Sequence, residues 1–268
     1  MSLKSELNLA RKNNYAIGCF NICNLETFQA VVNACVKTDK PVFVAISNKS
    51  LDYIGLDNVV GFKNSLKKGI KAFFHLDHGS YENCLKCINA GFDSVKFDGS
   101  KLALKENIGF TKKVVKKAKA KKILVEGEVG SLDGINLTSV AESIKFVKET
   151  GIDLLAVSVG NVHGYADKII IDYKRLEDIS TSVKVPIVFH GSSGLENNVI
   201  KNVLKLGVCK INVDSDLRMS FTKSLKDYFM AHSINHFNKD SFDMRNYLSI
   251  ARDSFEKKVI ERILLFHP

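Results

Sequence analysis

The chain has 268 residues, of which 45% are hydrophobic and 25% charged, and its formal net charge is +10. This length suits one large α/β domain, since an α/β barrel runs to about 250 residues. The sequence contains no apolar run of about 18 residues, and its first 14 residues lack the apolar core of a secretory signal. We therefore expect a cytoplasmic protein with no membrane partner.

The positive charge comes mostly from lysine, with a cluster in the segment TKKVVKKAKAKK at 111–122. One interpretation is a patch that binds nucleic acid or another anionic surface. The solvated face of a helix is favoured instead, because no aromatic residues are interleaved with the lysines and no nucleic-acid motif accompanies them. We expect no nucleic-acid partner, and a basic surface would favour phosphorylated substrates.

Short β-branched runs alternate along the chain with longer segments of helical period. The predicted strands are 15–22, 41–48, 71–78, 94–99, 122–129, 154–161, 186–191 and 208–214. The predicted helices are 24–37, 53–68, 81–90, 104–120, 138–150, 173–182, 196–206 and 216–230. Eight alternations of this kind predict a (β/α)8 TIM barrel. The tail from about 242 to 268 adds one more C-terminal helix, and residues 1–268 are expected to form a single domain.

Cys84 and Cys87 form a CxxC pair within one of the predicted helices. Such a pair can serve redox chemistry or metal binding. No second pair completes a zinc site, so we interpret both as reduced, buried thiols.

Three apolar runs end in histidine, in the segments KAFFHLDHG (71–79), LLAVSVGNVHG (154–164) and PIVFHGSSG (186–194). Packing explains these histidines poorly, because each run has already supplied its core residues. His78, His163 and His190 would converge where parallel strands end at one face of a barrel. Three neutral imidazoles with one open position are typical of a catalytic zinc site.

Carboxylates accompany these histidines. Asp77 precedes His78 and could orient a ligand or transfer protons at a metal-bound substrate. His75 lies deeper in the strand and is interpreted as supporting the site rather than as a ligand. Asp98 follows another strand, and Glu126 and Glu128 share one strand face. These acids could bind a second cation or tune the histidines, or they could be solvated loop acids or helix caps.

Two loops have the features of phosphate sites. The segments HGSSGL (190–195) and NVDSDLR (212–218) place small residues and hydroxyls just before predicted helices. Backbone N–H groups at helix starts after the seventh and eighth strands form the common phosphate site of this fold.

Taken together, these motifs resemble the class II, zinc-dependent fructose-1,6-bisphosphate aldolases over nearly the whole chain. The matching segments are YAIGCFNICNLE, HLDHGSYENC, AGFDSVKFDGS, VEGEVG, GIDLLAVSVGNVHG, VPIVFHGSSGL and LGVCKINVDSDLR. The resemblance implies a glycolytic lyase that reversibly cleaves fructose 1,6-bisphosphate to dihydroxyacetone phosphate and glyceraldehyde 3-phosphate. It also implies a zinc-stabilised enediolate and a homodimer or homotetramer.

The same resemblance assigns roles by position. It implies that His78, His163 and His190 hold the catalytic zinc, that Asp77 transfers the proton, and that Asp98 and Glu128 match a second divalent position. A monovalent cation is a further cofactor that it allows. The residues implied to contact the sugar phosphate are Asn24, Ser47, Gly164, Gly191, Ser193, Asn212, Asp214, Ser215 and Arg218.

The chain departs from the family pattern in two places. The segment GEVGSLDGINLTSV (127–140) is shorter than the usual loop and lacks its paired glutamates, so Asp133 is the candidate replacement base. Lys168, in HGYADK, is displaced from the usual lysine spacing and remains a candidate substrate contact.

Two alternatives stay open on the sequence. One is an aldolase for tagatose bisphosphate, against which Asp214 argues because those relatives tend to carry a small residue there. The other is a metal- and sugar-phosphate-binding paralogue that is catalytically impaired by the shortened loop.

Overall fold

The structure is a computed structural model that describes residues 2–131, 136–166, 169–234 and 237–268. Its strands are β1 (Ile17–Asn21), β2 (Val42–Ser47), β3 (Ala72–Gly79), β4 (Ser94–Phe97), β5 (Leu124–Val129), β6 (Leu154–Val157), β7 (Ile187–Phe189) and β8 (Val208–Val213). Its first helices are α1 (Leu3–Asn13), α2 (Leu25–Thr38), α3 (Asn48–Ile54), α4 (Leu56–Asn64), α5 (Tyr81–Asn89) and α6 (Leu104–Lys119). The others are α7 (Val140–Thr150), α8 (Tyr173–Ser182), α9 (Asn197–Lys205), α10 (Ser215–Ala231), the 3-10 turn η1 (Lys239–Phe242) and α11 (Met244–Phe266).

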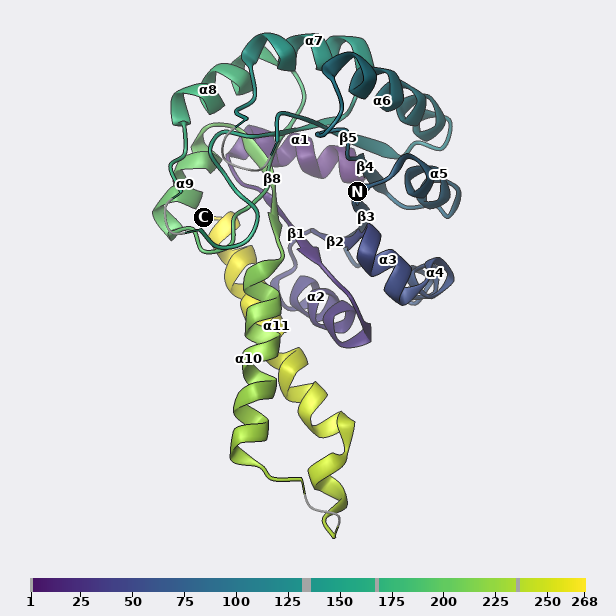
Figure 1. The fold of residues 1–268 in the computed structure, drawn as a ribbon, viewed down its shortest axis with the longest axis vertical. Coiled ribbons are helices and arrows are strands. Elements are labelled where there is room, and N and C mark those ends of the chain that lie inside the picture. Colours follow the sequence, from purple (N-terminus) through teal and green to yellow (C-terminus); the bar gives the residue numbers. More distant parts are fainter. Residues whose placement is uncertain (1, 132–135, 167–168, 235–236) are drawn as a thin grey trace.

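The eight strands form a closed parallel barrel in sequence order, and β8 pairs with β1 to complete it. The helices that follow the strands lie around this barrel (Figure 1). The predicted (β/α)8 barrel is therefore confirmed. The extra C-terminal helix is confirmed as well, since α11 covers most of the predicted tail.

Two features differ from the sequence prediction. The predicted helix 53–68 is replaced by α3 and α4, which meet at Gly55. Gly55 has a φ of 85°, a left-handed conformation that glycine adopts without strain and that interrupts a helix. The helix α1 was not predicted. Ser2 caps its first turn, and Leu3, Leu7 and Ala10 recur at helical spacing on its buried side.

The helix α1 closes one end of the barrel. Its buried side belongs to a cluster with inward-facing strand residues such as Ile17, Phe43 and Leu154, and Figure 1 shows α1 crossing the ring of strands. Because the strands run in parallel, the apolar plug lies at their N-terminal end. The opposite end, where the strands finish, is left for polar side chains.

The last two helices form an arm that projects from the barrel (Figure 1). Helices α10 and α11 pack against each other, and the C-terminal part of α11 packs on α2. Phe255 and Ile263 of α11 belong to the same buried cluster as the barrel and its surrounding helices. Within the described part of the chain, no helix has the length and apolar character needed to span a membrane.

Candidate functional site

The three predicted histidines lie at the C-terminal ends of neighbouring or nearby strands. His78 is the penultimate residue of β3, His163 lies in the loop after β6, and His190 directly follows β7. The pairing of β3 with β4 shifts register between Leu76 and Gly79, and His78 itself has a φ of 49°. Such a bulge re-aims a side chain. It allows the consecutive residues Asp77 and His78 both to face the barrel mouth.

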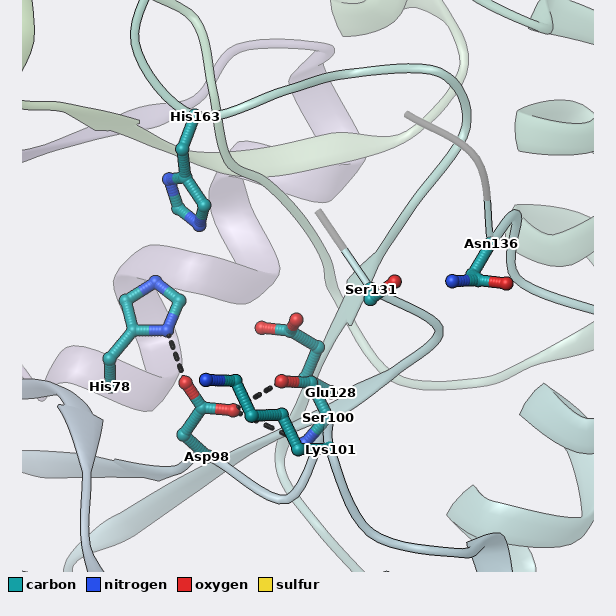
Figure 2. A pocket seen from close by; sticks show the side chains of 8 residues that line it. All are labelled: His78, Asp98, Ser100, Lys101, Glu128, Ser131, Asn136 and His163. Carbon is teal, nitrogen blue, oxygen red and sulfur yellow. Dashed lines mark hydrogen bonds and ion pairs between the residues drawn. The ribbon is translucent and has the colours of Figure 1, made fainter. Parts of the chain in front are cut away.

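A cavity of about 640 Å³ opens beside the histidines. His78 and His163 line one side of it, and Asp98 and Glu128 line another (Figure 2). The other lining residues are Ser100, Lys101, Ser131 and Asn136. The cavity therefore joins two of the predicted metal ligands to both predicted acidic positions.

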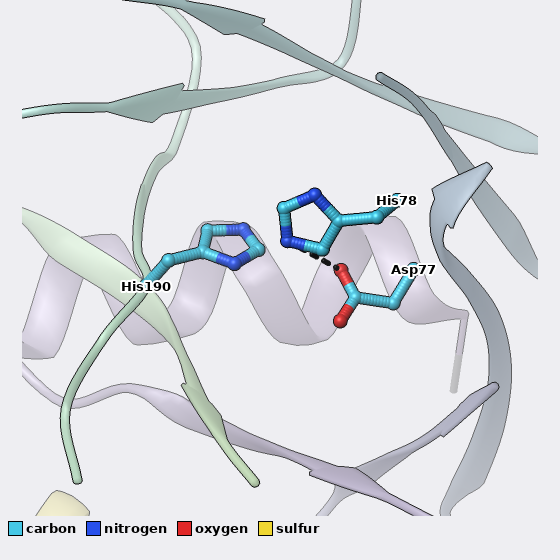
Figure 3. Close-up of side chains that lie close together, drawn as sticks. All are labelled: Asp77, His78 and His190. Atoms are coloured by element: carbon cyan, nitrogen blue, oxygen red, sulfur yellow. Dashed lines mark ion pairs between the residues drawn. The ribbon is translucent and has the colours of Figure 1, made fainter. Parts of the chain in front are cut away.

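The imidazole rings form a compact cluster. Ring centroids are 5.0 Å apart for His78 and His163, 5.1 Å for His78 and His190, and 6.1 Å for His163 and His190. Ligand atoms of Asp77, His78 and His190 all lie within 4.8 Å of one another, a spacing that could hold a metal ion (Figure 3). Two atoms here are buried without a hydrogen-bond partner among the described residues, His190 Nδ1 and Asp77 Oδ1.

Carboxylates orient two of the rings. His78 Nδ1 donates to Asp98 Oδ2 at 2.8 Å, and His190 Nε2 donates to Glu126 Oε1 at 2.9 Å. A carboxylate can only accept, so these bonds place the protons on those nitrogens. The ring nitrogens that remain to bind a metal are His190 Nδ1 and His78 Nε2, the latter with Lys96 Nζ 3.2 Å away. A carboxylate on the opposite nitrogen is the arrangement that orients histidine ligands in metalloenzymes. The residues present therefore fit a metal ion.

Burial and charge set the protonation of this cluster. Burial lowers the pKa of His163 to about 4, with the positive charge of His78 acting in the same direction. Burial would raise the pKa of Asp77, but the positive charges around it, of His78, Lys96 and Lys210, outweigh burial and hold that pKa well below its usual range. In the same way, the hydrogen bond from His78 outweighs the burial of Asp98 and holds its pKa below its usual range. Burial and the Lys96 charge would lower the pKa of His78, but Asp77, Asp98 and Glu128 outweigh them and raise it. A metal ion must therefore displace a proton from His78, whereas His163 is neutral and ready to bind.

Two buried lysines complete the barrel interior, and sequence analysis missed both. Lys96 Nζ lies 2.5 Å from Glu128 Oε2, and Lys210 Nζ lies 2.8 Å from Glu126 Oε2. All four side chains are almost fully buried. The sequence did indicate them, because a lysine within an otherwise apolar strand is rarely buried without a carboxylate partner.

A second cavity, of about 140 Å³, lies on the other side of the histidines. It brings together Asp77, the three histidines and most of the predicted sugar-phosphate contacts: Ser47, Gly164, Gly191, Ser193, Asn212, Asp214 and Ser215. The start of α10 borders this cavity, and Asp216 N donates to Ser193 Oγ at 3.1 Å. Hydroxyls and a helix N-terminus thus face the same space.

Gly191 allows the two loops of this cavity to meet. Its φ is 65°, and a Cβ atom there would lie 2.1 Å from the carbonyl oxygen of Val162. Only glycine fits so close a backbone approach. The chain after His190 is thereby held against the loop that carries His163.

The structure separates some predicted contacts from this cavity. Asn24 does not line it and instead caps α2 by accepting from Thr27 N. Asn21, which was not predicted, lines the cavity and donates to Asp77 Oδ2 at 3.1 Å. Arg218 lines an adjoining cavity of about 190 Å³ and forms a two-point ion pair with Asp214. Asp133 and Lys168 lie outside the described residues.

The CxxC interpretation can also be compared with the structure. Cys84 and Cys87 are buried free thiols on α5. Cys84 Sγ donates to the carbonyl oxygen of Lys96 at 3.6 Å. The pair therefore packs α5 on the barrel, as expected.

Comparison with known proteins places the chain in a well-described group. Residues 1–268 match the family described as "Fructose-bisphosphate aldolase class-II". The chain is 35% identical to a fructose-bisphosphate aldolase of Streptococcus pyogenes serotype M3, with 99% of this chain and 97% of the relative covered. It is 34% identical to a fructose-bisphosphate aldolase of Ureaplasma parvum, covering 100% and 97%.

Solved structures agree with this placement. The YdjI aldolase from Escherichia coli K12 superposes with a TM-score of 0.87 at 26% identity, covering 99% of this chain and 96% of that one. The fructose-bisphosphate aldolase of Campylobacter jejuni gives a TM-score of 0.86 at 23% identity, covering 100% and 95%. At that identity the second likeness supports the fold alone.

Proposed function

Because this chain belongs to the class II fructose-bisphosphate aldolase family, a family of metal-dependent lyases, we propose that it reversibly cleaves fructose 1,6-bisphosphate. The products would be dihydroxyacetone phosphate and glyceraldehyde 3-phosphate. The single observation that carries the proposal is the histidine cluster. There, His190 Nδ1 and Asp77 Oδ1, which have no hydrogen-bond partner in the described part of the chain, lie beside His78 at the mouth of the barrel.

We propose zinc as the metal, held by His78, His163 and His190. Nitrogen ligands with one position open to substrate are the donor set of catalytic zinc. When bound, the ion supplies Lewis-acid stabilisation of negative charge on the substrate's ketone oxygen. Asp98 and Glu126 would hold the His78 and His190 rings in place for it, as their hydrogen bonds indicate.

Asp77 is proposed as the proton-transfer residue at the substrate oxygen. Asn21 fixes one carboxylate oxygen by donating to Oδ2, and Oδ1 stays available at the cavity. The lowered pKa keeps the carboxylate ionised, so in cleavage it can accept the hydroxyl proton of the sugar. In the reverse reaction the same group returns that proton to the aldehyde oxygen. Asp133 remains the proposed base for the carbon-bound proton.

The 140 Å³ cavity is proposed to hold the dihydroxyacetone-phosphate end of the substrate. Its contacts would be the backbone and hydroxyl groups at Gly164, Gly191, Ser193 and Ser215, next to the start of α10. Lys168 and Ser47 are proposed as further contacts, with Arg218 for the far phosphate. Asn212 and Asp214 border the same cavity. For Asn24, the family resemblance is the only support for a contact with substrate.

We also propose that copies of this chain associate through the arm of α10 and α11 into a homodimer or a homotetramer. The arm exposes Met230 by 75% and Ile234 by 66%, and Phe229 and Met244 are exposed beside them. A second copy of this chain would cover these apolar side chains. Light scattering should then give a multiple of the chain mass, and Met230→Lys with Ile234→Lys should shift it toward the monomer.

Residues 1–268 are proposed to act as one domain, because α11 shares a buried cluster with the barrel helices. A single cooperative unfolding transition, coincident by circular dichroism and by tyrosine fluorescence, is the expected result. Two separated transitions would contradict it.

The substrate is tested by comparing kcat/KM for fructose 1,6-bisphosphate and tagatose 1,6-bisphosphate on the same zinc-loaded preparation. We expect kcat/KM to be at least tenfold higher for the fructose epimer. The substitution Asp214→Ala should reduce this ratio. Equal or reversed preference in the wild type would favour the tagatose alternative. Binding of both sugars without turnover would favour the impaired paralogue.

A further inference from the structure

Lys96 lies against the histidine cluster with its whole side chain buried in the barrel. Its Nζ is 3.2 Å from His190 Nε2, and 3.2 and 3.3 Å from the two ring nitrogens of His78. We infer that the Lys96 ammonium is a built-in cation that takes the place of a second divalent ion. The cluster would then bind one metal ion per chain. This inference rests on the proposed metal site at the three histidines.

The position of the Lys96 amine leaves room for the zinc ion proposed at His78, His163 and His190. On His190, Lys96 lies at Nε2, which also donates to Glu126, and the unpartnered Nδ1 is on the other edge of the ring. The nearly equal distances to both nitrogens of His78 place the amine beside that ring. An amine in line with the Nε2 lone pair would be much farther from Nδ1. Lys96 therefore lies off the line of the His78 Nε2 lone pair and away from His190 Nδ1.

The same amine pairs with one of the two carboxylates that a second ion would need. Asp98 and Glu128 face the 640 Å³ cavity beside His78 (Figure 2). Two carboxylates on one cavity wall are the oxygen ligands that a divalent cation prefers. Glu128 Oε2 is 2.5 Å from Lys96 Nζ, whereas Asp98 is already bonded to His78 and Ser100. The ammonium is thus the counter-ion of Glu128.

The charges around the cluster agree with a single metal ion. Four carboxylates surround the cluster. Asp77, Asp98 and Glu126 contact histidines, and Glu128 pairs with Lys96. Two of these charges are cancelled by Lys96 and Lys210. Once a metal ion has displaced the proton of His78 and all three imidazoles are neutral, two negative charges remain, which one divalent cation cancels. Without Lys96 three would remain, and a buried excess of charge attracts a further cation.

The test counts bound metal directly. Wild-type protein, Lys96→Met and Lys96→Met with Glu128→Gln are stripped with chelator, dialysed against micromolar zinc, and analysed for zinc per chain. Methionine matches the length of lysine and lacks its charge. Lys63→Met is the matched control, because Lys63 also forms an ion pair, with Asp93, but lies half-buried away from the histidines. Thermal unfolding of each stripped variant shows that it is folded.

We expect one zinc per chain for the wild type and for Lys63→Met, and two for Lys96→Met. The second equivalent should disappear in the variant that also carries Glu128→Gln. Two equivalents in the wild type would overturn the inference, and that result does not depend on any variant folding. One equivalent in folded Lys96→Met, at unchanged affinity, would overturn it as well. No bound zinc in the wild type would instead overturn the proposed histidine site, and this inference with it.

Discussion

Glu126 connects the metal site to the stability of the barrel, so replacing it tests both. One carboxylate oxygen accepts from His190 Nε2 at 2.9 Å, and the other pairs with Lys210 Nζ at 2.8 Å. All three side chains are fully buried. Glu126→Gln keeps the size and shape of the side chain but removes its charge. Lys210 would then be a buried ammonium that keeps only neutral partners among the described residues, Asn212 Oδ1 at 2.8 Å and His75 Nε2 at 3.4 Å.

Glu126→Gln should lower both the free energy of unfolding and the affinity for metal. Removing one member of a buried ion pair costs about 3–5 kcal/mol, because it leaves an uncompensated charge. A folded domain has only about 5–15 kcal/mol of stability, so a large part of the total would be lost. Loss of the carboxylate that orients a ligand histidine weakens metal binding by about 10–100-fold.

A second substitution separates the two effects. Adding Lys210→Met to Glu126→Gln removes the unpaired charge, so most of the lost stability should return. Metal affinity should stay low, because His190 still lacks its carboxylate partner. Urea unfolding of stripped protein measures the first quantity, and zinc competition with a chromophoric chelator measures the second.

Two results would refute this reasoning. A cost below about 1 kcal/mol for Glu126→Gln would mean that the Lys210 charge is solvated or neutral in the folded chain. Recovery of zinc affinity in the double variant would mean that Glu126 acts on the metal only through Lys210, and not through His190.

Three further outcomes follow from single residues. Asp77→Asn should keep zinc while turnover falls about 10²–10⁴-fold; full turnover would exclude its role in proton transfer. Gly191→Ala should destabilise by about 2 kcal/mol or more, from its left-handed backbone and the contact with Val162. Gly61→Ala in α4, with open space around it, should be neutral or slightly stabilising in the same urea assay. Burial lowers the pKa of His75 to about 3, below the unfolded value of about 6.5. Its contribution to stability is therefore complete above pH 6.5 and is lost as pH falls toward 3, by up to about 1.4 kcal/mol per pH unit. His75→Gln should make the stripped protein's stability profile less steep between pH 6.5 and 5, while His163, whose pKa is also lowered, keeps part of the slope. An unchanged slope would contradict this assignment.

Much of the fold could be predicted because several barrel strands, such as β6, β7 and β2 up to Ile46, are continuously apolar. A run such as LLAV in β6 has no polar side chain for a solvent-facing side, so it indicates a strand that is buried on both faces. A histidine that ends such a run stands out for the same reason. The helix α1 was missed because only Leu3, Leu7 and Ala10 carry its apolar side, within an otherwise polar segment.

Side-chain partners across the barrel could not be read from the sequence. Strand alternation places Lys96 and Glu128 inside, but their ion pair joins residues from two strands whose register only the folded barrel fixes. Asn24 does not line the cavity, for a local reason. Asparagine at a helix start favours capping, and that is the role Asn24 has, whereas Asn21 at the end of β1 reaches Asp77.

Fructose 1,6-bisphosphate cleavage before and after chelation tests the central claim most directly. Purified protein is assayed with zinc, after removal of the metal, and after zinc is restored. We predict turnover in the usual enzyme range of about 1–10³ s⁻¹ with zinc, its loss on chelation, and its recovery when zinc returns. Turnover that persists in the fully stripped protein would contradict a metal-dependent aldolase at these histidines.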